Sequence, residues 1–222
     1  MNIVENFLLV ALKPDKPGFL ISPEALGAGT VGALFIELLL KKSIEIKDSK
    51  VYVKRVPNST TNPVDELLYK IHHSKKPKKA KFWISKFAHA PGKFKWFFLD
   101  NMKRKRYVRI DKKKFIFIPY RRTSLINKRE REHLISGLRE TLFHPNEITM
   151  ESGSLLGLIG ACKLQKVLCK DRSELRDIKL KLKTLIEREQ ISHDVDQVIK
   201  EMHAAVIAAV TASTGATAAA VG

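Results

Sequence analysis

Hydrophobic residues recur at helical spacing along most of the chain. The pattern begins in residues 3–13, where apolar side chains fall three and four positions apart and predict a first helix. A second helix is predicted to begin at Ser22-Pro23-Glu24. Ser is a good N-cap, Pro suits the first helical turn, and an acid there faces the positive end of the helix dipole. This helix runs to Lys42 and is so apolar that we expect it to be central and buried.

Short segments with a period of two interrupt the helices twice. Residues 44–53 alternate around a turn at Asp48-Ser49 and predict a β-hairpin. A second hairpin is predicted from residues 107–110 and 114–120, with its turn at 111–113. Further helices are predicted over residues 64–73, 80–90, 93–106, 125–143, 150–170, 173–189 and 192–210. The expected fold is mainly α, a single globular helical domain over residues 1–222 with two short hairpins and a frayed, Ala-rich end at 211–222.

Positive charge is concentrated in one stretch of the chain. Residues 70–131 hold 22 Lys and Arg residues against three acids, a net charge of +19, whereas the whole chain carries +18. The rest of the chain is therefore close to neutral. A surface this basic attracts polyanions, either the phosphates of nucleic acid or acidic lipid headgroups. We expect residues 70–131 to form one basic, membrane-facing segment within the domain.

An apolar run lies in the middle of this basic stretch. Residues 112–122 read Lys-Lys-Lys-Phe-Ile-Phe-Ile-Pro-Tyr-Arg-Arg. In a strand, Phe115 and Phe117 would point to one face, and Ile116 and Ile118 to the other. Either both pairs are buried in the domain, or one pair is exposed and enters a membrane interface or another subunit. Nucleic acid has little use for exposed Ile and Phe, whereas a bilayer interface accommodates them.

The sequence contains none of the common catalytic or metal-binding motifs. It has no Gly-rich phosphate loop, no Gly-x-Ser-x-Gly and no His-Glu-x-x-His. Cys162 and Cys169 lie about two helical turns apart, too far to bond each other, and we expect buried thiols in a reducing compartment. Glu37, in the apolar second helix, is expected to make an ion pair or a helix-end contact. We predict that the protein is not an enzyme and that it has no cofactor and no metal site. The N-terminus shows no secretory signal.

The apolar C-terminal end of the chain has two interpretations. Residues 202–222 are long enough to cross a membrane and nearly uncharged, but they are mostly Ala, Thr and Gly, which insert poorly. We therefore favour a core helix over residues 198–210, followed by the frayed end. A C-terminal membrane span is the alternative.

Five segments, taken with their order and spacing, resemble the Golgi phosphoprotein 3 family. They are Phe-Leu-Leu-Val-Ala-Leu-Lys at 7–13 with Gly18, Gly-Ala-Leu-Phe-Ile-Glu-Leu at 32–38, Leu-Asp-Asn-Met-Lys at 99–103, Phe-Ile-Phe-Ile at 115–118 and Val-Ile-Ala-Ala-Val at 206–210. The family comprises peripheral membrane proteins that bind phosphatidylinositol 4-phosphate. The resemblance implies a helical core with an exposed hairpin, no catalysis, and headgroup binding beside the hairpin. It also implies self-association through the hairpin and, in a eukaryotic member, a place on the cytosolic face of the Golgi, where the protein holds glycosyltransferases by their cytosolic tails.

At three of the four positions that form the family's lipid pocket, this chain lacks the aromatic or cationic side chain that the family has. The family has a Trp and an Arg near the second helix, where this chain has Ser22 and Val31. Of two later Arg residues, Asp100 replaces one, and Lys103 keeps a positive charge at the other. The surrounding cations would then bind acidic lipid less selectively.

The sequence favours a non-enzymatic peripheral membrane protein, a membrane-trafficking adaptor that binds anionic lipid or a phosphoinositide. The predicted headgroup-binding residues are Lys103, Arg104, Lys105, Arg106, Arg109, Arg121 and Arg122. The predicted insertion or self-association hairpin consists of Lys112, Lys113, Lys114, Phe115, Ile116, Phe117 and Ile118. A winged-helix-like nucleic-acid-binding protein is the alternative, because a helix followed by a basic hairpin is the outline of that motif.

Overall fold

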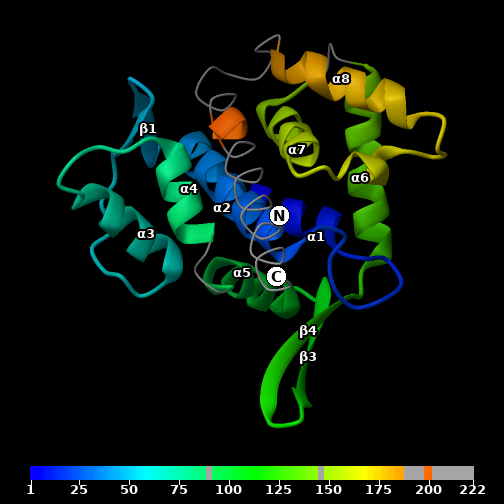
Figure 1. The fold of residues 1–222 in the computed structure, drawn as a ribbon, viewed down its shortest axis with the longest axis horizontal. Coiled ribbons are helices and arrows are strands. Elements are labelled where there is room, and N and C mark those ends of the chain that lie inside the picture. The colour runs from blue at the N-terminus through cyan, green and yellow to red at the C-terminus, as the bar shows by residue number, and fades with distance from the viewer. Residues whose placement is uncertain (89–91, 145–147, 188–197, 202–222) are drawn as a thin grey trace, which may run out of the picture.

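The fold is mainly α, with two antiparallel two-stranded hairpins (Figure 1). A computed structural model describes residues 1–88, 92–144, 148–187 and 198–201, without the side chain of Phe115. The helices are α1 (Ile3–Ala11), α2 (Pro23–Leu40), α3 (Pro63–His72), α4 (Ala80–Ala88), α5 (Lys93–Arg104), α6 (Lys128–Phe143), α7 (Met150–Ala161), the 3-10 helix η2 (Gln165–Leu168) and α8 (Leu175–Glu187). The strands are β1 (Ile44–Lys47), β2 (Lys50–Val53), β3 (Val108–Phe115) and β4 (Ile118–Leu125). The predicted fold class is confirmed, including the repeated order of a helix followed by a hairpin.

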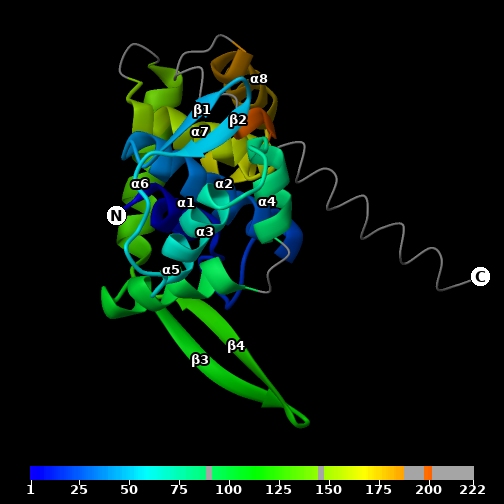
Figure 2. The same cartoon turned by 90° about the vertical axis from the view of Figure 1, so that its left-hand side faces the viewer.

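Helices α1 and α2 lie at the centre of the molecule, with α4, α5 and α7 packed around them (Figures 1 and 2). Helix α2 begins as predicted, because Ser22 Oγ accepts the N–H of Ala25 at 3.3 Å. Among the described helices, α2 is long and apolar enough to cross a membrane by length and composition. In this fold 67% of it is buried, as expected for the core helix that the sequence predicts.

Glu37 connects the end of α2 to the start of α1. Its Oε2 accepts the N–H of Ile3 at 2.9 Å, and its Oε1 lies 2.9 Å from Nζ of Lys41. The first N–H groups of a helix have no partner within the helix, so this carboxylate satisfies one of them. The predicted role of Glu37 is confirmed, as both a helix-end contact and an ion pair.

A glycine lets α1, α2 and α7 approach each other closely. A Cβ added at Gly29 of α2 would lie 2.3 Å from Cζ of Phe7 and 2.7 Å from Sγ of Cys162. Only hydrogen fits between such neighbours. Gly137 of α6 has the opposite environment, since nothing lies within 4 Å of the equivalent point.

The helix predicted over residues 150–170 is wrong in its second half. Helix α7 ends at Ala161, Lys163 takes a left-handed φ of 57°, and the chain continues into η2. Cys162 and Cys169 therefore do not share a helix face. Both thiols are free, as expected, but only Cys162 is fully buried, and burial raises its pKa to about 12.

The C-terminal helix predicted over residues 192–210 lies mostly outside the described residues. Residues 198–201 are helical, and Val198 and Ile199 are buried in the core. The predicted frayed end at 211–222 also lies outside the described part of the chain.

The two hairpins differ in how well the sequence predicts their turns. The β1–β2 turn falls at Asp48 and Ser49 as expected, and both residues have positive φ. In the second hairpin the turn predicted at 111–113 is wrong. Its strands pair from Val108↔Leu125 to Phe115↔Ile118, so the chain reverses at residues 116–117. The expected alternation of Phe and Ile across one strand is wrong for the same reason.

Candidate functional site

Strands β3 and β4 form a ribbon that projects from one end of the helical body (Figures 1 and 2). Each strand has eight residues, which at about 3.3 Å per residue makes the ribbon roughly 25 Å long. Its base is packed against the body, where Val108, Ile110 and Thr123 are buried. The carbonyl of Thr123 also accepts the N–H of Gly18 at 2.8 Å. Every described side chain from 112 to 120 is exposed.

The tip of this ribbon is apolar and exposed to solvent. Ile116 is 76% exposed, Phe117 is 90% exposed and Ile118 is 69% exposed. Ile116 also has a φ of 57°, a left-handed conformation that costs an ordinary residue about 1–2 kcal/mol. A β-branched residue in this conformation is uncommon, and such strain is typical of functional sites. For these three residues, the alternative in which the apolar pairs are buried in the domain is wrong.

Cations occupy both strands just behind the tip. Lys112, Lys113 and Lys114 lie on β3 and Arg122 on β4, and none of them forms an ion pair with an acid in the described part of the chain. Lys112 also lies directly opposite Arg121, a like-charged pair that destabilises the ribbon. Charged residues on exposed strand edges prevent pairing with other chains, so these cations also have a structural explanation. The exposed apolar residues at the tip have no comparable structural explanation.

Arg121 connects the ribbon to helix α5. Its guanidinium donates to both carboxylate oxygens of Asp100 at 3.0–3.3 Å, and its Cζ lies 4.6 Å from the ring centre of Trp96. Paired hydrogen bonds and stacking on an aromatic ring are the contacts that suit a planar guanidinium. Arg121 is therefore engaged within the fold, although its predicted binding of a headgroup stays a prediction.

Two more of the predicted headgroup-binding residues have partners at the end of α5. Lys105 Nζ lies 2.8 Å from both carboxylate oxygens of Glu5, whose side chain is only 2% exposed. Glu5 also accepts the N–H of Asn2 and so completes the capping box of α1. Arg104 donates to the side-chain oxygen of Asn101. These contacts are structural, so the cations here are only partly available to an external anion.

Four predicted headgroup-binding residues remain near the base and along the ribbon. Arg109 lies 3.3 Å from Asp111 through its Nε. Lys103 and Arg106 are exposed and form no ion pair with any described residue, as is also the case for Arg122. Lys103, Arg106 and Arg122, together with the lysines of β3, are the cations best placed to meet an anion near the hairpin.

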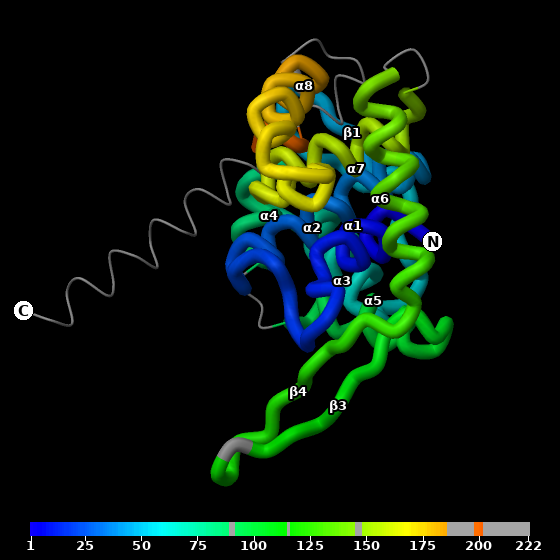
Figure 3. Tube along the Cα trace, turned by 90° about the vertical axis from the view of Figure 1, so that its right-hand side faces the viewer, coloured from blue at the N-terminus to red at the C-terminus, as the bar shows by residue number. Residues whose placement is uncertain are grey.

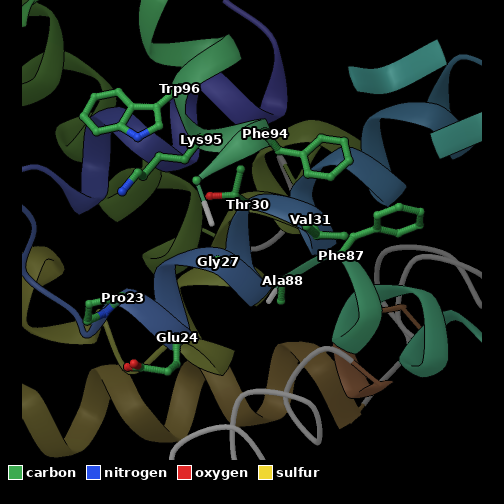
Figure 4. A pocket seen from close by; sticks show the side chains of 11 residues that line it. Pro23, Glu24, Gly27, Thr30, Val31, Phe87, Ala88, Phe94, Lys95 and Trp96 are labelled. Carbon is green, nitrogen blue, oxygen red and sulfur yellow. The ribbon is translucent and has the colours of Figure 1, made fainter. Parts of the chain in front are cut away.

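A pocket of about 430 Å³, which the sequence does not predict, opens beside α2 (Figure 4). It is lined by Pro23, Glu24, Gly27, Thr30, Val31, Phe87, Ala88, Gly92, Phe94, Lys95 and Trp96. Lys95 Nζ lies 4.7 Å from the ring centre of Trp96, and burial lowers the pKa of Lys95 below its ordinary value. No motif marks this pocket, because its walls come from α2, the end of α4 and the start of α5.

The four positions where the resemblance implies a lipid pocket carry little positive charge. Val31 lines the pocket but is apolar and only 1% exposed, and Ser22 is the N-cap of α2. Asp100 is held by Arg121. Of these four positions only Lys103 carries a cation, and it forms no ion pair with any residue that the structure describes. Within the described residues, no group of three or more His, Cys, Asp or Glu could hold a metal ion.

The fold and the site define a class of protein: a helical domain whose most exposed large apolar side chains, among the described residues, lie at the tip of a cationic hairpin. The chain belongs to the Golgi phosphoprotein 3 family, because the model of the family described as Golgi phosphoprotein 3 (GPP34) matches residues 3–202. This match covers nearly the whole chain, including the hairpin and the pocket, and it confirms the resemblance noted from the sequence. A search of curated proteins finds no match to the chain.

Proposed function

We propose that this protein is a non-enzymatic peripheral membrane protein that binds anionic lipid through the β3–β4 hairpin. The observation that carries the proposal is the exposure of Ile116, Phe117 and Ile118 at the end of a ribbon whose strand β3 holds three lysines that form no ion pair with any described residue. Apolar side chains enter the boundary between headgroups and acyl chains, while cations behind them meet lipid phosphates.

Two modest interactions add to give useful binding. Burying one Ile or Phe side chain contributes about 1.5–3 kcal/mol, and a lysine close to an acidic leaflet contributes about 1 kcal/mol. Part of this sum offsets the loss of translational and rotational freedom on binding. Binding should therefore be reversible and sensitive to salt, and neither the tip nor the lysines alone would hold the protein on a membrane.

The family supports a finer form of the proposal. A phosphoinositide, phosphatidylinositol 4-phosphate by family resemblance, is the expected headgroup, and the cytosolic face of the Golgi is the expected place in a eukaryotic cell. An adaptor of this kind would hold the cytosolic tails of membrane proteins and would self-associate through its hairpin. Because Val31 and Asp100 stand where the family has arginines, we propose that this chain binds acidic lipids with little selectivity between them.

Flotation with lipid vesicles tests the proposal. Neutral phosphatidylcholine vesicles are compared with vesicles that contain phosphatidylserine, and with vesicles that contain phosphatidylinositol 4-phosphate at matched surface charge. We expect recovery with both acidic mixtures, little recovery with neutral vesicles, and a steep loss as salt is raised. Equal recovery with neutral and acidic vesicles would contradict the proposal.

Nucleic acid is the competing polyanion. The exposed apolar tip disfavours it, because base readout needs polar side chains at the contact. A gel-shift assay with duplex DNA over a salt series separates the two functions. Tight DNA binding with a steep salt dependence, together with no binding to vesicles, would reverse the assignment.

A further inference from the structure

Helix α4 carries a second group of exposed aromatic and cationic side chains. Phe82 is 44% exposed, and Nζ of Lys78 and of Lys86 lie 5.4 Å and 5.7 Å from its ring centre. A shallow hollow here is lined by Lys78, Lys79, Lys81, Phe82, Ser85 and Lys86, which we call the Phe82 cluster. No ion pair joins its four lysines to an acid in the described part of the chain, although Glu201 accepts the backbone N–H of Lys81.

The core does not need these side chains. The inner face of α4 buries Ala80, Trp83, Ile84 and Phe87, and Phe82 lies off that stripe. A cation–π contact at an exposed site contributes about 0.5–1 kcal/mol, and the mutual repulsion of close lysines opposes it. Within the described part of the chain the Phe82 cluster therefore has no ion-pair partner, and it combines the same chemistry as the hairpin tip, an exposed ring among ammonium groups.

The hairpin and α4 lie toward the same side of the molecule. Figures 2 and 3 show the ribbon leaning, as it leaves the body, to the side on which α4 lies. If the ribbon stood upright on a membrane, the body would be held roughly 25 Å away, well beyond the screening length of about 8 Å at physiological salt. The lysines of the body would then contribute little. A molecule lying on its α4 side would bring the hairpin and helix α4 to one leaflet.

We propose that the Phe82 cluster is a second contact with acidic phospholipid, so that the protein lies on the leaflet with both the hairpin tip and α4 touching it. This inference rests on the proposed function. An aromatic ring flanked by ammonium groups suits the headgroup layer, where rings sit at the interface and lysines reach lipid phosphates. An acidic protein segment would satisfy the charge, but the shared side and the repeated chemistry favour the membrane.

A fluorescent probe at position 82 tests the contact directly. A nitrobenzoxadiazole label is attached to Phe82→Cys, with Cys169→Ser removing the thiol that is not fully buried. Matched proteins carry the label at Phe117→Cys on the hairpin and at Leu180→Cys on α8, which is 62% exposed. On phosphatidylserine vesicles we expect brighter, blue-shifted emission at positions 82 and 117 and no change at 180. If the emission changes at position 117 but not at position 82, the second contact is wrong and the proposed function is unaffected. If neither label changes its emission and the unlabelled protein does not float with vesicles, the second contact and the proposed function are both wrong.

Paired substitutions provide an independent measurement. Phe82→Ser with Lys86→Glu should lower the vesicle partition coefficient ~10-fold or more. Leu180→Ser with Lys179→Glu makes the same kind of change on α8 and should leave it unaltered. All four residues are exposed, so both proteins should keep their melting temperature. If the α4 variant binds vesicles as well as the wild type and instead loses binding to polyglutamate, the partner is an acidic protein segment and the proposal is wrong.

Discussion

Replacing Phe117 with Ser tests the central claim about the hairpin most directly. The side chain is 90% exposed, so nearly all of its apolar surface is free to be buried in a bilayer interface. Full burial of a Phe side chain contributes about 1.5–3 kcal/mol, and each 1.4 kcal/mol is roughly a tenfold change in an equilibrium constant. We therefore expect Phe117→Ser to weaken partitioning into acidic vesicles by roughly 30-fold, with Ile116 and Ile118 retaining the remainder.

Co-sedimentation with phosphatidylserine vesicles over a range of lipid concentrations measures this change. Leu180→Ser on α8 is the matched control, since it removes an exposed apolar side chain of similar size and should leave partitioning unchanged. Both variants should unfold at the wild-type temperature, because neither side chain is in the core. Unaltered binding by Phe117→Ser, or an equal loss in both variants, would refute the reasoning.

Other parts of the structure make predictions that can be measured separately. Arg121→Ala removes the contacts between the ribbon and α5 and should speed hydrogen exchange in β3 and β4, at a cost of about 1 kcal/mol because the pair is partly exposed. Gly29→Ala should destabilise the fold by about 1–3 kcal/mol in urea, because its added carbon overlaps side chains of α1 and α7. Gly137→Ala, which faces open space within α6, should instead stabilise it by about 0.5–1 kcal/mol. Hydrogen bonds from Arg139 lower the pKa of Glu174 from 4.5 to about 2. This carboxylate therefore stabilises the fold above pH 4.5, and the contribution is lost as the pH falls toward 2. Glu174→Gln should flatten that part of an acid-unfolding curve followed by circular dichroism.

Local chemistry made most of the fold predictable from the sequence. Ser22 begins α2 because a hydroxyl at the N-cap satisfies a free N–H, and Asp48 with Ser49 forms a turn because these residues tolerate positive φ. The turn predicted at residues 111–113 of the second hairpin is wrong, because polar residues such as these usually mark turns. In a ribbon with solvent on both sides, lysines are stable within the strand, and the apolar residues form the turn. That arrangement can be understood only once the ribbon is known to leave the body.

The candidate site was predictable in its chemistry but not in its connections. The basic stretch and its apolar centre are visible in the sequence, whereas the partners of its cations are distant in the chain. Lys105 binds Glu5, one hundred residues away, and Arg121 binds Asp100 on a preceding helix. The pocket beside α2 draws on three helices and has no local pattern. Contacts of this kind depend on tertiary packing, which the order of polar and apolar residues does not encode locally.

The outer half of the ribbon contributes nothing to the hydrophobic core, so its length can change without affecting the packing of the helices. Deleting one cross-strand pair brings the tip about 3.3 Å closer to the body and turns every outer side chain to the opposite face. Deleting two pairs keeps the original facing and shortens the reach by roughly 7 Å. The ribbon thus acts as an adjustable spacer, whose length sets the distance between the tip and the helical body.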